Sequence, residues 1–415
     1  MTSHDRLITP DLPLPALPRQ PEGTPWPTET WPLGEMPRQM NREGFDELVA
    51  KAFSQPDDLG ETHAFLAVQG GKLIFEKYAE GFGPHDTYKS WSMAKSITQA
   101  LIGILVREGK IDIHAPVKAP EWPAGDPRAA ITLDQLLRMS SGLAFREDYE
   151  PDNPSDVIEM LWGSGKEDVA RFAASFPAAY APDHFWSYSS GTSNIVARCA
   201  AEAAGKKGAA FEAFMRKELF DVIGMKNVMP KFDAAGTFIG SSFCYAEARD
   251  FAKFGLLYLR GGAWDGRQVL PEGWVDYART PTAQTPKAFE EEGPYGAHWW
   301  LGMGGPGSFS ANGFEGQFTL IVPDLDMVFV RHGRSPGEQS KNVKKWLGAV
   351  TGFTCAAALG TAGRCCPKAG STMPAPPPPR PRKPSRKKDL TAPIGGLAWA
   401  DREVSRPMAS KGSSR

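Results

Sequence analysis

A serine and a lysine three residues apart, Ser92 and Lys95, are the strongest candidates for chemistry in this sequence of 415 residues. They lie near the start of the segment KSWSMAKSITQALIGILVREG, residues 89–109, whose apolar residues recur at helical spacing. Side chains three residues apart share one face of a helix, so the Lys95 ammonium group is expected to reach the Ser92 hydroxyl. A serine hydroxyl is a weak nucleophile near neutral pH and needs a neighbouring base or cation. The pair therefore predicts a nucleophilic serine at the start of a buried helix.

This spacing alone does not establish catalysis, because it recurs by chance in long chains, as at Ser385 and Lys388. An N-cap serine followed by a solvated lysine is the alternative. The segment HFWSYSSGTSNIVARC favours the catalytic interpretation, because it places Tyr188, Ser189 and Ser190 where a loop meets a predicted helix. A phenol beside a cation ionises more readily and can act as a base, although ring packing is the alternative for a tyrosine in an aromatic segment.

Together these motifs resemble those of the serine β-lactamase and penicillin-binding-protein superfamily. The branch they resemble has a tyrosine as its base and includes class C β-lactamases, carboxylesterases of that fold and 6-aminohexanoate-dimer hydrolases. Ser92 to Lys95 matches the first motif, Tyr188 to Ser190 matches the second, and supporting segments such as TLDQLLRMSSGLAF extend the likeness over roughly residues 40–350. The resemblance implies that Ser92, Lys95 and Tyr188 are catalytic. It also implies an α+β, β-lactamase/DD-peptidase-like fold, with an antiparallel sheet flanked by helices and an inserted, mainly helical domain.

The third motif of that superfamily, Lys-Thr-Gly or His-Thr-Gly, is absent from this sequence. Its best positional match is Ala311-Asn312-Gly313, just before FEGQFTLIVP. In the superfamily, the residue after the motif glycine contributes a backbone N–H to the oxyanion hole, opposite the N–H of the nucleophile. The resemblance therefore implies an oxyanion hole formed by the N–H groups of Ser92 and Phe314, which would stabilise the charged oxygen of a tetrahedral intermediate.

Five residues are candidates for substrate binding: Ser190, Asn312, Gly313, Trp186 and Trp300. The two tryptophans belong to the aromatic segments DHFWSY and YGAHWWLGM, which can line an apolar acyl site, although core packing is the alternative for either ring. The missing motif lysine helps to hold a substrate carboxylate in the superfamily. Its absence favours neutral esters and amides over β-lactams and D-Ala-D-Ala peptides.

The predicted elements follow the order strands, one helix, a helical block and strands. A helix over residues 42–53 is capped by Asn41, and a hairpin turns at Gly70 and Gly71 before the helix that carries Lys95. Later strands are predicted at YGAHWWLGM, GQFTLIVP and DMVFVRHG. His332, in the last of these, is a second possible motif histidine but is interpreted as structural. This order is typical of an α+β sheet interrupted by a helical insertion.

Composition divides the chain into three parts. A Pro-rich N-terminal extension, which Trp26 and Trp31 are expected to hold against the body, precedes a β-lactamase-like serine hydrolase domain and a basic, Pro-rich tail that is predicted to be disordered. The three parts cover residues 1–40, 41–350 (an α/β part at 41–115 and 241–350 with a helical insertion at 116–240) and 351–415.

Charge and residue spacing argue against several other classes of protein. The net charge is −1, but residues 366–415 hold eleven Lys and Arg against three Asp and Glu, so the rest of the chain is mildly acidic. A nucleic-acid or anionic-membrane surface is therefore not expected on the body. The seven histidines show no HxH or HExxH spacing, and the five cysteines are irregularly placed, so neither a metal nor another cofactor is predicted. No signal peptide or membrane span is recognised, which favours a cytoplasmic location.

The combined prediction is a serine acyl hydrolase that acts on a small-molecule ester or amide through a covalent acyl-enzyme. A Ser-His-Asp hydrolase is disfavoured because no G-x-S-x-G sequence occurs. Two alternatives remain open from the sequence. One is a β-lactamase or D-amino peptidase, and the other is a catalytically inactive binding or scaffold protein of the same fold.

Overall fold

The computed structural model describes residues 14–38, 40–149, 155–282 and 293–355. Its helices are α1 (Arg42–Ser54), α2 (Pro56–Leu59), α3 (Ala94–Arg107), α4 (Leu133–Leu137), α5 (Asp156–Trp162), α6 (Val169–Ala174), α7 (Ser190–Ala204), α8 (Ala209–Met215), α9 (Ala248–Leu259), α10 (Trp274–Arg279) and α11 (Glu338–Cys355). Its strands are β1 (Glu61–Gln69), β2 (Lys72–Tyr78), β3 (Thr87–Lys89), β4 (Met229–Pro230), β5 (Cys244–Glu247), β6 (Ala263–Trp264), β7 (Arg267–Gln268), β8 (Trp300–Leu301), β9 (Phe309–Gly313), β10 (Gln317–Val322) and β11 (Met327–Arg334). Beyond residue 355, the predicted tail lies outside the described residues.

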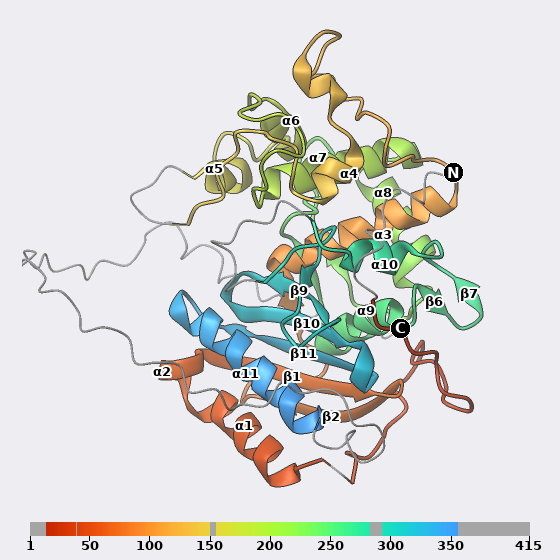
Figure 1. Cartoon of the computed structure of the whole chain (residues 1–415), viewed down its shortest axis with the longest axis vertical. Helices are drawn as coiled ribbons and strands as arrows, with labels where there is room; N and C mark the ends of the chain where they lie inside the picture. The colour runs from red at the N-terminus through yellow and green to blue at the C-terminus, as the bar shows by residue number, and fades with distance from the viewer. Residues whose placement is uncertain (1–13, 39, 150–154, 283–292, 356–415) are drawn as a thin grey trace, which may run out of the picture. The chain divides into compact units, whose positions relative to one another are not determined.

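A six-stranded antiparallel sheet, in the order β2-β1-β11-β10-β9-β8, forms the centre of the α/β part (Figure 1). The predicted hairpin is confirmed: β1 pairs with β2, and Gly70 and Gly71 form the turn with φ of 58° and 75°. Successive residues of β1 point to opposite faces, so Leu66 packs in one hydrophobic cluster and Phe65 in another. The sheet is therefore buried on both faces, and the predicted α+β architecture is confirmed.

Helices cover each face of this sheet (Figure 1). Helices α1 and α11 pack on the Phe65 face, where Phe45 and Trp346 are buried. Helices α3 and α9 pack on the other face, where Leu101 and Leu256 are buried. The sequence pattern does not predict α11, because glycine and threonine interrupt its apolar positions and the basic tail follows directly. Packing of residues such as Trp346 against the sheet stabilises it nevertheless, and it continues past residue 350 to Cys355.

A second, small sheet in the order β3-β5-β4 positions the segment that contains Ser92. Strand β3 pairs antiparallel with β5 through Tyr88 and Ala246, and it leads directly into the turn before α3. The strands of this sheet have two to four residues, too few for an alternating pattern to identify them in the sequence.

The helical block predicted between the two parts of the sheet contains α4 to α8. Helix α4 begins at a capping box, in which the Gln135 N–H donates to Thr132 Oγ1 and the Thr132 N–H donates to Gln135 Oε1. Helix α7 is largely buried and packs against α3, which lies between the block and the sheet (Figure 1). It ends at Gly205, whose φ of 66° is the left-handed conformation that glycine favours. These contacts bring the start of α7 next to the start of α3.

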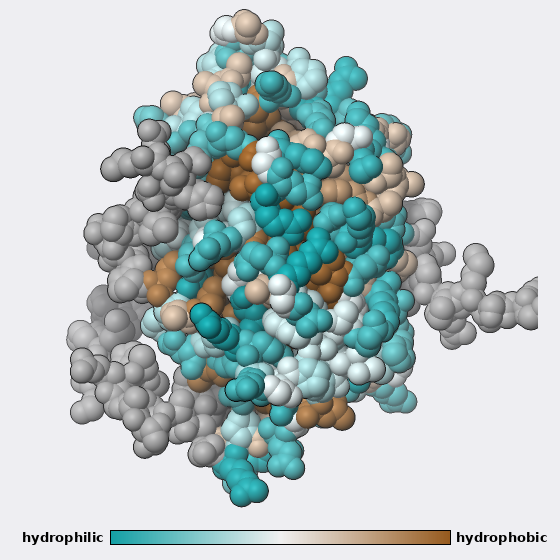
Figure 2. Space-filling view, turned by 90° about the vertical axis from the view of Figure 1, so that its right-hand side faces the viewer, coloured by the Kyte–Doolittle hydropathy of each residue, from teal (hydrophilic) through white to brown (hydrophobic). Residues whose placement is uncertain are grey.

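The described part of the Pro-rich N-terminal extension lies against the body, as the two tryptophans predicted. The Trp26 ring lies 4.9 Å from that of Trp264, whose indole N–H donates to Thr28 Oγ1, and Trp31 is partly buried against the core. The face in Figure 2 is mostly hydrophilic, with apolar residues in separate small areas. Within the described ranges, no helix has the length and hydrophobicity that crossing a bilayer requires.

Candidate active site

Ser92 lies in a single 3₁₀ turn, Trp91–Met93, that joins β3 to α3. Ser90 fixes this turn, because its N–H donates to the Cys244 carbonyl and its hydroxyl oxygen accepts from the Cys244 N–H, both at 3.0 Å. Trp91 has a φ of 44°, a conformation that residues other than glycine rarely adopt. Backbone strain of this kind persists only where the surrounding structure enforces it, and here it orients Ser92 toward a pocket.

Lys95, in the first turn of α3, has three hydrogen-bond partners. Its Nζ lies 3.0 Å from Ser92 Oγ, 2.9 Å from Ser190 Oγ and 3.0 Å from the Ser241 carbonyl oxygen. The residue is 1% exposed, so the ammonium group is removed from bulk water. The predicted contact between Ser92 and Lys95 is therefore present, and Ser190 joins it from the second motif.

Burial lowers the pKa of Lys95 from its usual 10.5 to about 8, while the negative charge of Glu147 acts in the opposite direction. The partners of Lys95 determine where a neutral amine would direct its lone pair. The Ser241 carbonyl can only accept, and the Ser190 hydroxyl donates its proton to Glu147 at 2.6 Å, so both must accept from Lys95. A neutral amine has two N–H bonds, which these two acceptors use. Its lone pair then faces the Ser92 hydroxyl, as a general base requires.

Glu147 is a site residue that the sequence motifs do not identify. Its carboxylate accepts from the Ser190 N–H at 2.7 Å and the Ser190 hydroxyl at 2.6 Å, and also from the Tyr149 hydroxyl at 2.8 Å. The loop that holds it packs on the first turn of α7, where a Cβ on Gly191 would lie 2.7 Å from the Phe145 ring. Glu147 is 43 residues from Ser190 and sits in a loop. No periodicity or spacing in the sequence marks it.

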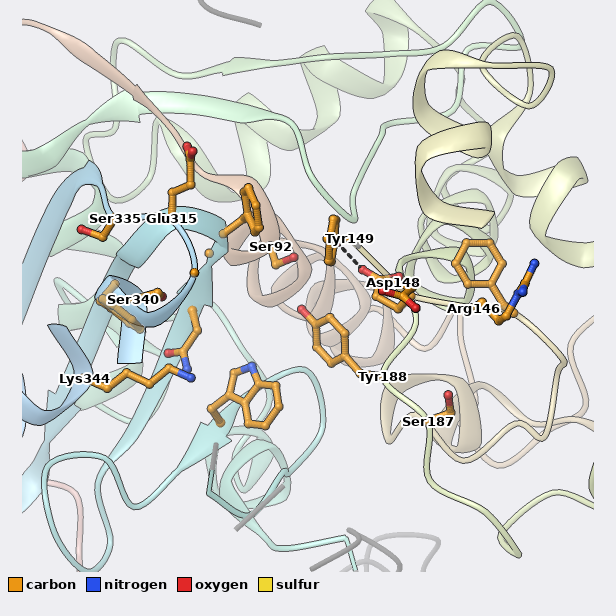
Figure 3. Close-up of a pocket in the computed structure, with 18 of the residues that line it drawn as sticks. Ser92, Arg146, Asp148, Tyr149, Ser187, Tyr188, Glu315, Ser335, Ser340 and Lys344 are labelled. Atoms are coloured by element: carbon orange, nitrogen blue, oxygen red, sulfur yellow. Dashed lines mark hydrogen bonds between the residues drawn. The ribbon is translucent and has the colours of Figure 1, made fainter. Parts of the chain in front are cut away.

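Tyr188 lines the same pocket and lies beside Lys95, whose Nζ is 4.8 Å from the centre of the phenol ring. Figure 3 shows its hydroxyl pointing toward the turn that carries Ser92. Aromatic residues hold the ring from behind: Trp300 stacks on it at 5.5 Å, and Tyr295 meets it edge-on at 5.9 Å. The three predicted catalytic side chains are therefore brought together at one pocket.

The two predicted oxyanion donors belong to segments that touch each other. Strand β9 ends at Gly313, and a Cβ at this position would lie 2.3 Å from the Ser90 carbonyl oxygen. Only glycine allows this approach of β9 to the turn that contains Ser92. Phe314 follows directly, and its ring meets that of Trp91 edge-on at 5.6 Å. Strand β9 thus packs against the turn that contains Ser92, and Ser92 and Phe314 both line the pocket. An oxyanion hole formed by their two N–H groups stays a prediction.

The pocket has a volume of about 850 Å³ and is lined by both parts of the domain. Both polar side-chain atoms of Asn312 are buried without a hydrogen-bond partner among the residues the structure describes, so its amide is available to a ligand. Lys344, from α11, points toward the pocket at the end opposite Arg146 and Ser187 (Figure 3). A cation therefore reaches the site from a helix that the sequence pattern did not predict, although the superfamily's motif lysine is absent.

The remaining predicted residues have supporting positions. Trp186 lines the pocket but is 1% exposed, and it packs against Tyr295 at 5.5 Å and Trp300 at 6.1 Å. His332 is buried, stacks on Tyr88 at 4.6 Å and is not among the residues that line the pocket, which agrees with a structural role. Within the described ranges, no group of three or more His, Cys, Asp or Glu has the arrangement of a metal site.

His298 is a second supporting residue that the motifs do not identify. Its Nδ1 lies 2.9 Å from the Lys95 carbonyl oxygen and its Nε2 lies 3.2 Å from Ser193 Oγ. Burial, with the positive charge of Lys95, lowers its pKa to about 3, so the imidazole is neutral at physiological pH. It links the first turn of α3 to α7 and thereby holds the backbone of Lys95 near Ser190.

The chain is similar to known proteins over most of its length. The β-lactamase family model matches residues 49–352. The 6-aminohexanoate-dimer hydrolase of Paenarthrobacter ureafaciens is 26% identical over 309 residues, which are 70% of this chain and 76% of that protein.

Two solved structures share the fold. A Bacillus anthracis protein described as a 6-aminohexanoate-dimer hydrolase has a TM-score of 0.63 at 20% identity, over 85% of this chain and 92% of the other. A family VIII carboxylesterase has a TM-score of 0.58 at 13% identity, over 76% of this chain and 99% of the other.

Proposed function

Because the chain belongs to the β-lactamase family, we propose that it is a serine acyl hydrolase that cleaves an ester or amide bond through a covalent acyl-enzyme. The observation that carries this proposal is the environment of Lys95. Its Nζ lies 3.0 Å from Ser92 Oγ, its other two hydrogen bonds go to fixed acceptors, and its pKa is lowered to about 8. A buried lysine arranged in this way is suited to accept a proton from a serine.

In the acylation step, Ser92 Oγ attacks the substrate carbonyl carbon and its proton passes to neutral Lys95. The backbone N–H groups of Ser92 and Phe314 stabilise the negatively charged oxygen of the tetrahedral intermediate. Tyr188 donates its proton to the leaving nitrogen or oxygen as the bond to the carbonyl carbon breaks, and the phenolate then takes the proton held by Lys95. The proton of Ser92 is thereby transferred to the leaving group.

In the deacylation step, water attacks the acyl-enzyme and gives a proton to the same pair of groups. The bond to Ser92 Oγ breaks and the oxygen regains its proton, which releases the acid and restores the enzyme. The role of Tyr188 rests on its position beside Lys95, in the pocket that Ser92 also lines.

A linear amide is the substrate class that the comparisons favour for a first test, because a relative is named for hydrolysis of 6-aminohexanoate dimer. Such a dimer carries a carboxylate, and Lys344 provides a positive charge at one end of the pocket. Aromatic walls such as Tyr188 and Trp300 suit the apolar methylene chain between the charged groups.

The proposal is tested by fluorophosphonate labelling of the full chain, followed by mass spectrometry to find the modified residue. Label on Ser92, and its loss in Ser92→Ala, is the expected result. Turnover of p-nitrophenyl esters, nitrocefin and 6-aminohexanoate dimer then separates esterase, β-lactamase and amidase activities. A folded protein that neither takes the label nor turns over any of these substrates would instead be a binding protein of this fold.

A further inference from the structure

A second cavity of about 320 Å³ adjoins the pocket that contains Ser92. The two cavities share four lining residues: Phe145, Arg146, Phe185 and Ser187. In Figure 3, Arg146 and Ser187 lie on the side of Tyr188 away from Lys344. The second cavity therefore continues the first one at the end opposite the cation, and no part of the proposed mechanism uses it.

Two loops of the helical insertion form this cavity, and backbone hydrogen bonds hold them together. The Ala179 N–H donates to the Gly142 carbonyl at 2.8 Å, and the Ser187 N–H donates to the Met139 carbonyl at 2.9 Å. Gly142 has a φ of 77°, and a Cβ there would lie 2.1 Å from the Tyr180 carbonyl oxygen. The close contact between the loops requires glycine at this position. The cavity is therefore preformed rather than a gap between loosely placed segments.

The lining of the cavity is suited to an apolar ligand. Two of its three serine hydroxyls already accept within the protein, Ser189 Oγ from the Thr192 N–H at 3.1 Å and Ser141 Oγ from the Leu143 N–H at 3.4 Å. The guanidinium of Arg146, which also lines the cavity, lies 3.8 Å from the Asp156 carboxylate. The backbone polar groups of its loops pair with each other, as at Ala179. A polar ligand would therefore find few free hydrogen-bond partners in this cavity, whereas a hydrocarbon chain needs none.

Two stacked aromatic rings stand at the edge of the cavity. Tyr180 and Phe185 have ring centres 4.4 Å apart, yet they remain 51% and 42% exposed. Large apolar side chains exposed next to a cavity are typical of a ligand-binding surface. Phe185 also lines the pocket of Ser92, so the two stacked rings form an apolar wall that runs from one cavity to the other.

We propose that this second cavity is a distal subsite, which binds an unbranched apolar chain of a substrate whose carbonyl group lies at Ser92. The inference rests on the proposed serine hydrolase function and adds a preference for long chains over short ones. Each methylene group that enters an apolar site is expected to raise kcat/KM by about threefold, up to the length that fills the cavity. The second cavity thus makes the enzyme selective for chain length.

The test measures kcat/KM for two matched ester series. In one series the acyl chain of p-nitrophenyl esters grows from acetate to dodecanoate, and in the other the alcohol chain of alkyl acetates grows by the same steps. The expected result is a rise with chain length in one of the two series. Ala179→Trp, which fills the cavity, and Tyr180→Ala, which removes half of the aromatic wall, should each reduce the ratio of long-chain to short-chain kcat/KM by about tenfold or more.

Leu33→Ala is the matched control, because Leu33 is 76% exposed and lines neither of these two cavities, and its ratio should equal that of the unchanged protein. Thermal unfolding confirms that each variant is folded, and Tyr180→Ala provides the result if the larger tryptophan prevents folding. Hydrolysis with no dependence on chain length, or a dependence that survives both variants, would overturn the subsite alone. Loss of all hydrolysis and of labelling at Ser92 in the unchanged protein would overturn the proposed function and the subsite with it.

Discussion

Among the residues that the structure describes, two regions bury a lysine, and their surroundings differ. Lys95 in α3 is 1% exposed and Lys253 in α9 is 7% exposed. Lys253 has a carboxylate within its own helix, Asp250 at 3.2 Å, and it also donates to the Gly224 carbonyl. The direct partners of Lys95 are neutral, and its nearest carboxylate, Glu147, acts through the hydroxyl of Ser190.

This difference separates a structural lysine from a chemically active one. At Lys253, a carboxylate in direct contact compensates the buried positive charge. Around Lys95 the cost of burying the charge is only partly offset, so its pKa falls to about 8 and it can exchange a proton near physiological pH. Lys95, at the pocket, is therefore the lysine whose positive charge is only partly compensated by its surroundings.

Replacing Lys95 by methionine should produce the largest effect. We expect kcat/KM to fall by about 10³- to 10⁴-fold, because the group that accepts the Ser92 proton is lost. Since burial of the charged Lys95 is itself destabilising at pH 7, its removal should not lower the free energy of unfolding at that pH by more than about 1 kcal/mol. Steady-state kinetics and urea denaturation measure the two effects. Activity within tenfold of the unchanged protein would mean that Lys95 is not the base.

Replacing Lys253 by methionine should affect stability instead of catalysis. Asp250 would remain buried without its partner, which costs about 3 kcal/mol of unfolding free energy. Burial already raises the pKa of Asp250 to about 6, above its unfolded value of 3.8. Asp250 is thus protonated below about pH 6. At higher pH the variant must either bury an ionised carboxylate without the lysine beside it or keep Asp250 protonated, and both lower the free energy of unfolding. The loss in urea denaturation should therefore be larger at pH 8 than at pH 5, while the folded protein keeps its kcat.

Replacing Glu147 by glutamine should shift the pH dependence of activity. In the proposed mechanism, kcat/KM rises as Lys95 loses its proton around pH 8. The negative charge of Glu147 raises the pKa of Lys95, so its removal should move this rise to lower pH. Glu147→Asp keeps the charge and should leave the rise near its original position. A profile that does not move in Glu147→Gln would show that the carboxylate only positions Ser190.

Replacing Asn312 by alanine should give the smallest effect, on KM. The Asn312 amide lines the pocket, and both of its polar atoms are buried without a partner among the described residues, so its removal should raise KM by about fivefold without loss of stability. Asn342 is the matched control, because its amide donates to the Asp58 carbonyl and carboxylate oxygens, both at 3.1 Å. Asn342→Ala should lower stability by about 1 kcal/mol and leave KM unchanged. A loss of stability in Asn312→Ala with no change in KM would assign Asn312 a structural role.

Local patterns in the sequence determined the parts of the site that lie on regular elements. The three-residue spacing from Ser92 to Lys95 brings the two side chains to 3.0 Å because the 3₁₀ turn that contains Ser92 leads directly into the first turn of α3. Alternation predicted the hairpin of β1 and β2 and its glycine turn, and the motif around Tyr188 led to the start of α7. These features depend on neighbours within a few residues, so the sequence alone carries them.

Tertiary structure decided the rest. Glu147 reaches Ser190 because Gly191 lets its loop pack closely on α7, and no local pattern encodes a contact between residues 43 positions apart. Lys344 reaches the pocket because α11 is stabilised by burial against the sheet rather than by its own sequence. The pKa of Lys95 follows from which groups surround it after folding. A sequence specifies spacing along the chain, whereas solvent exposure and charge neutralisation depend on how distant segments pack.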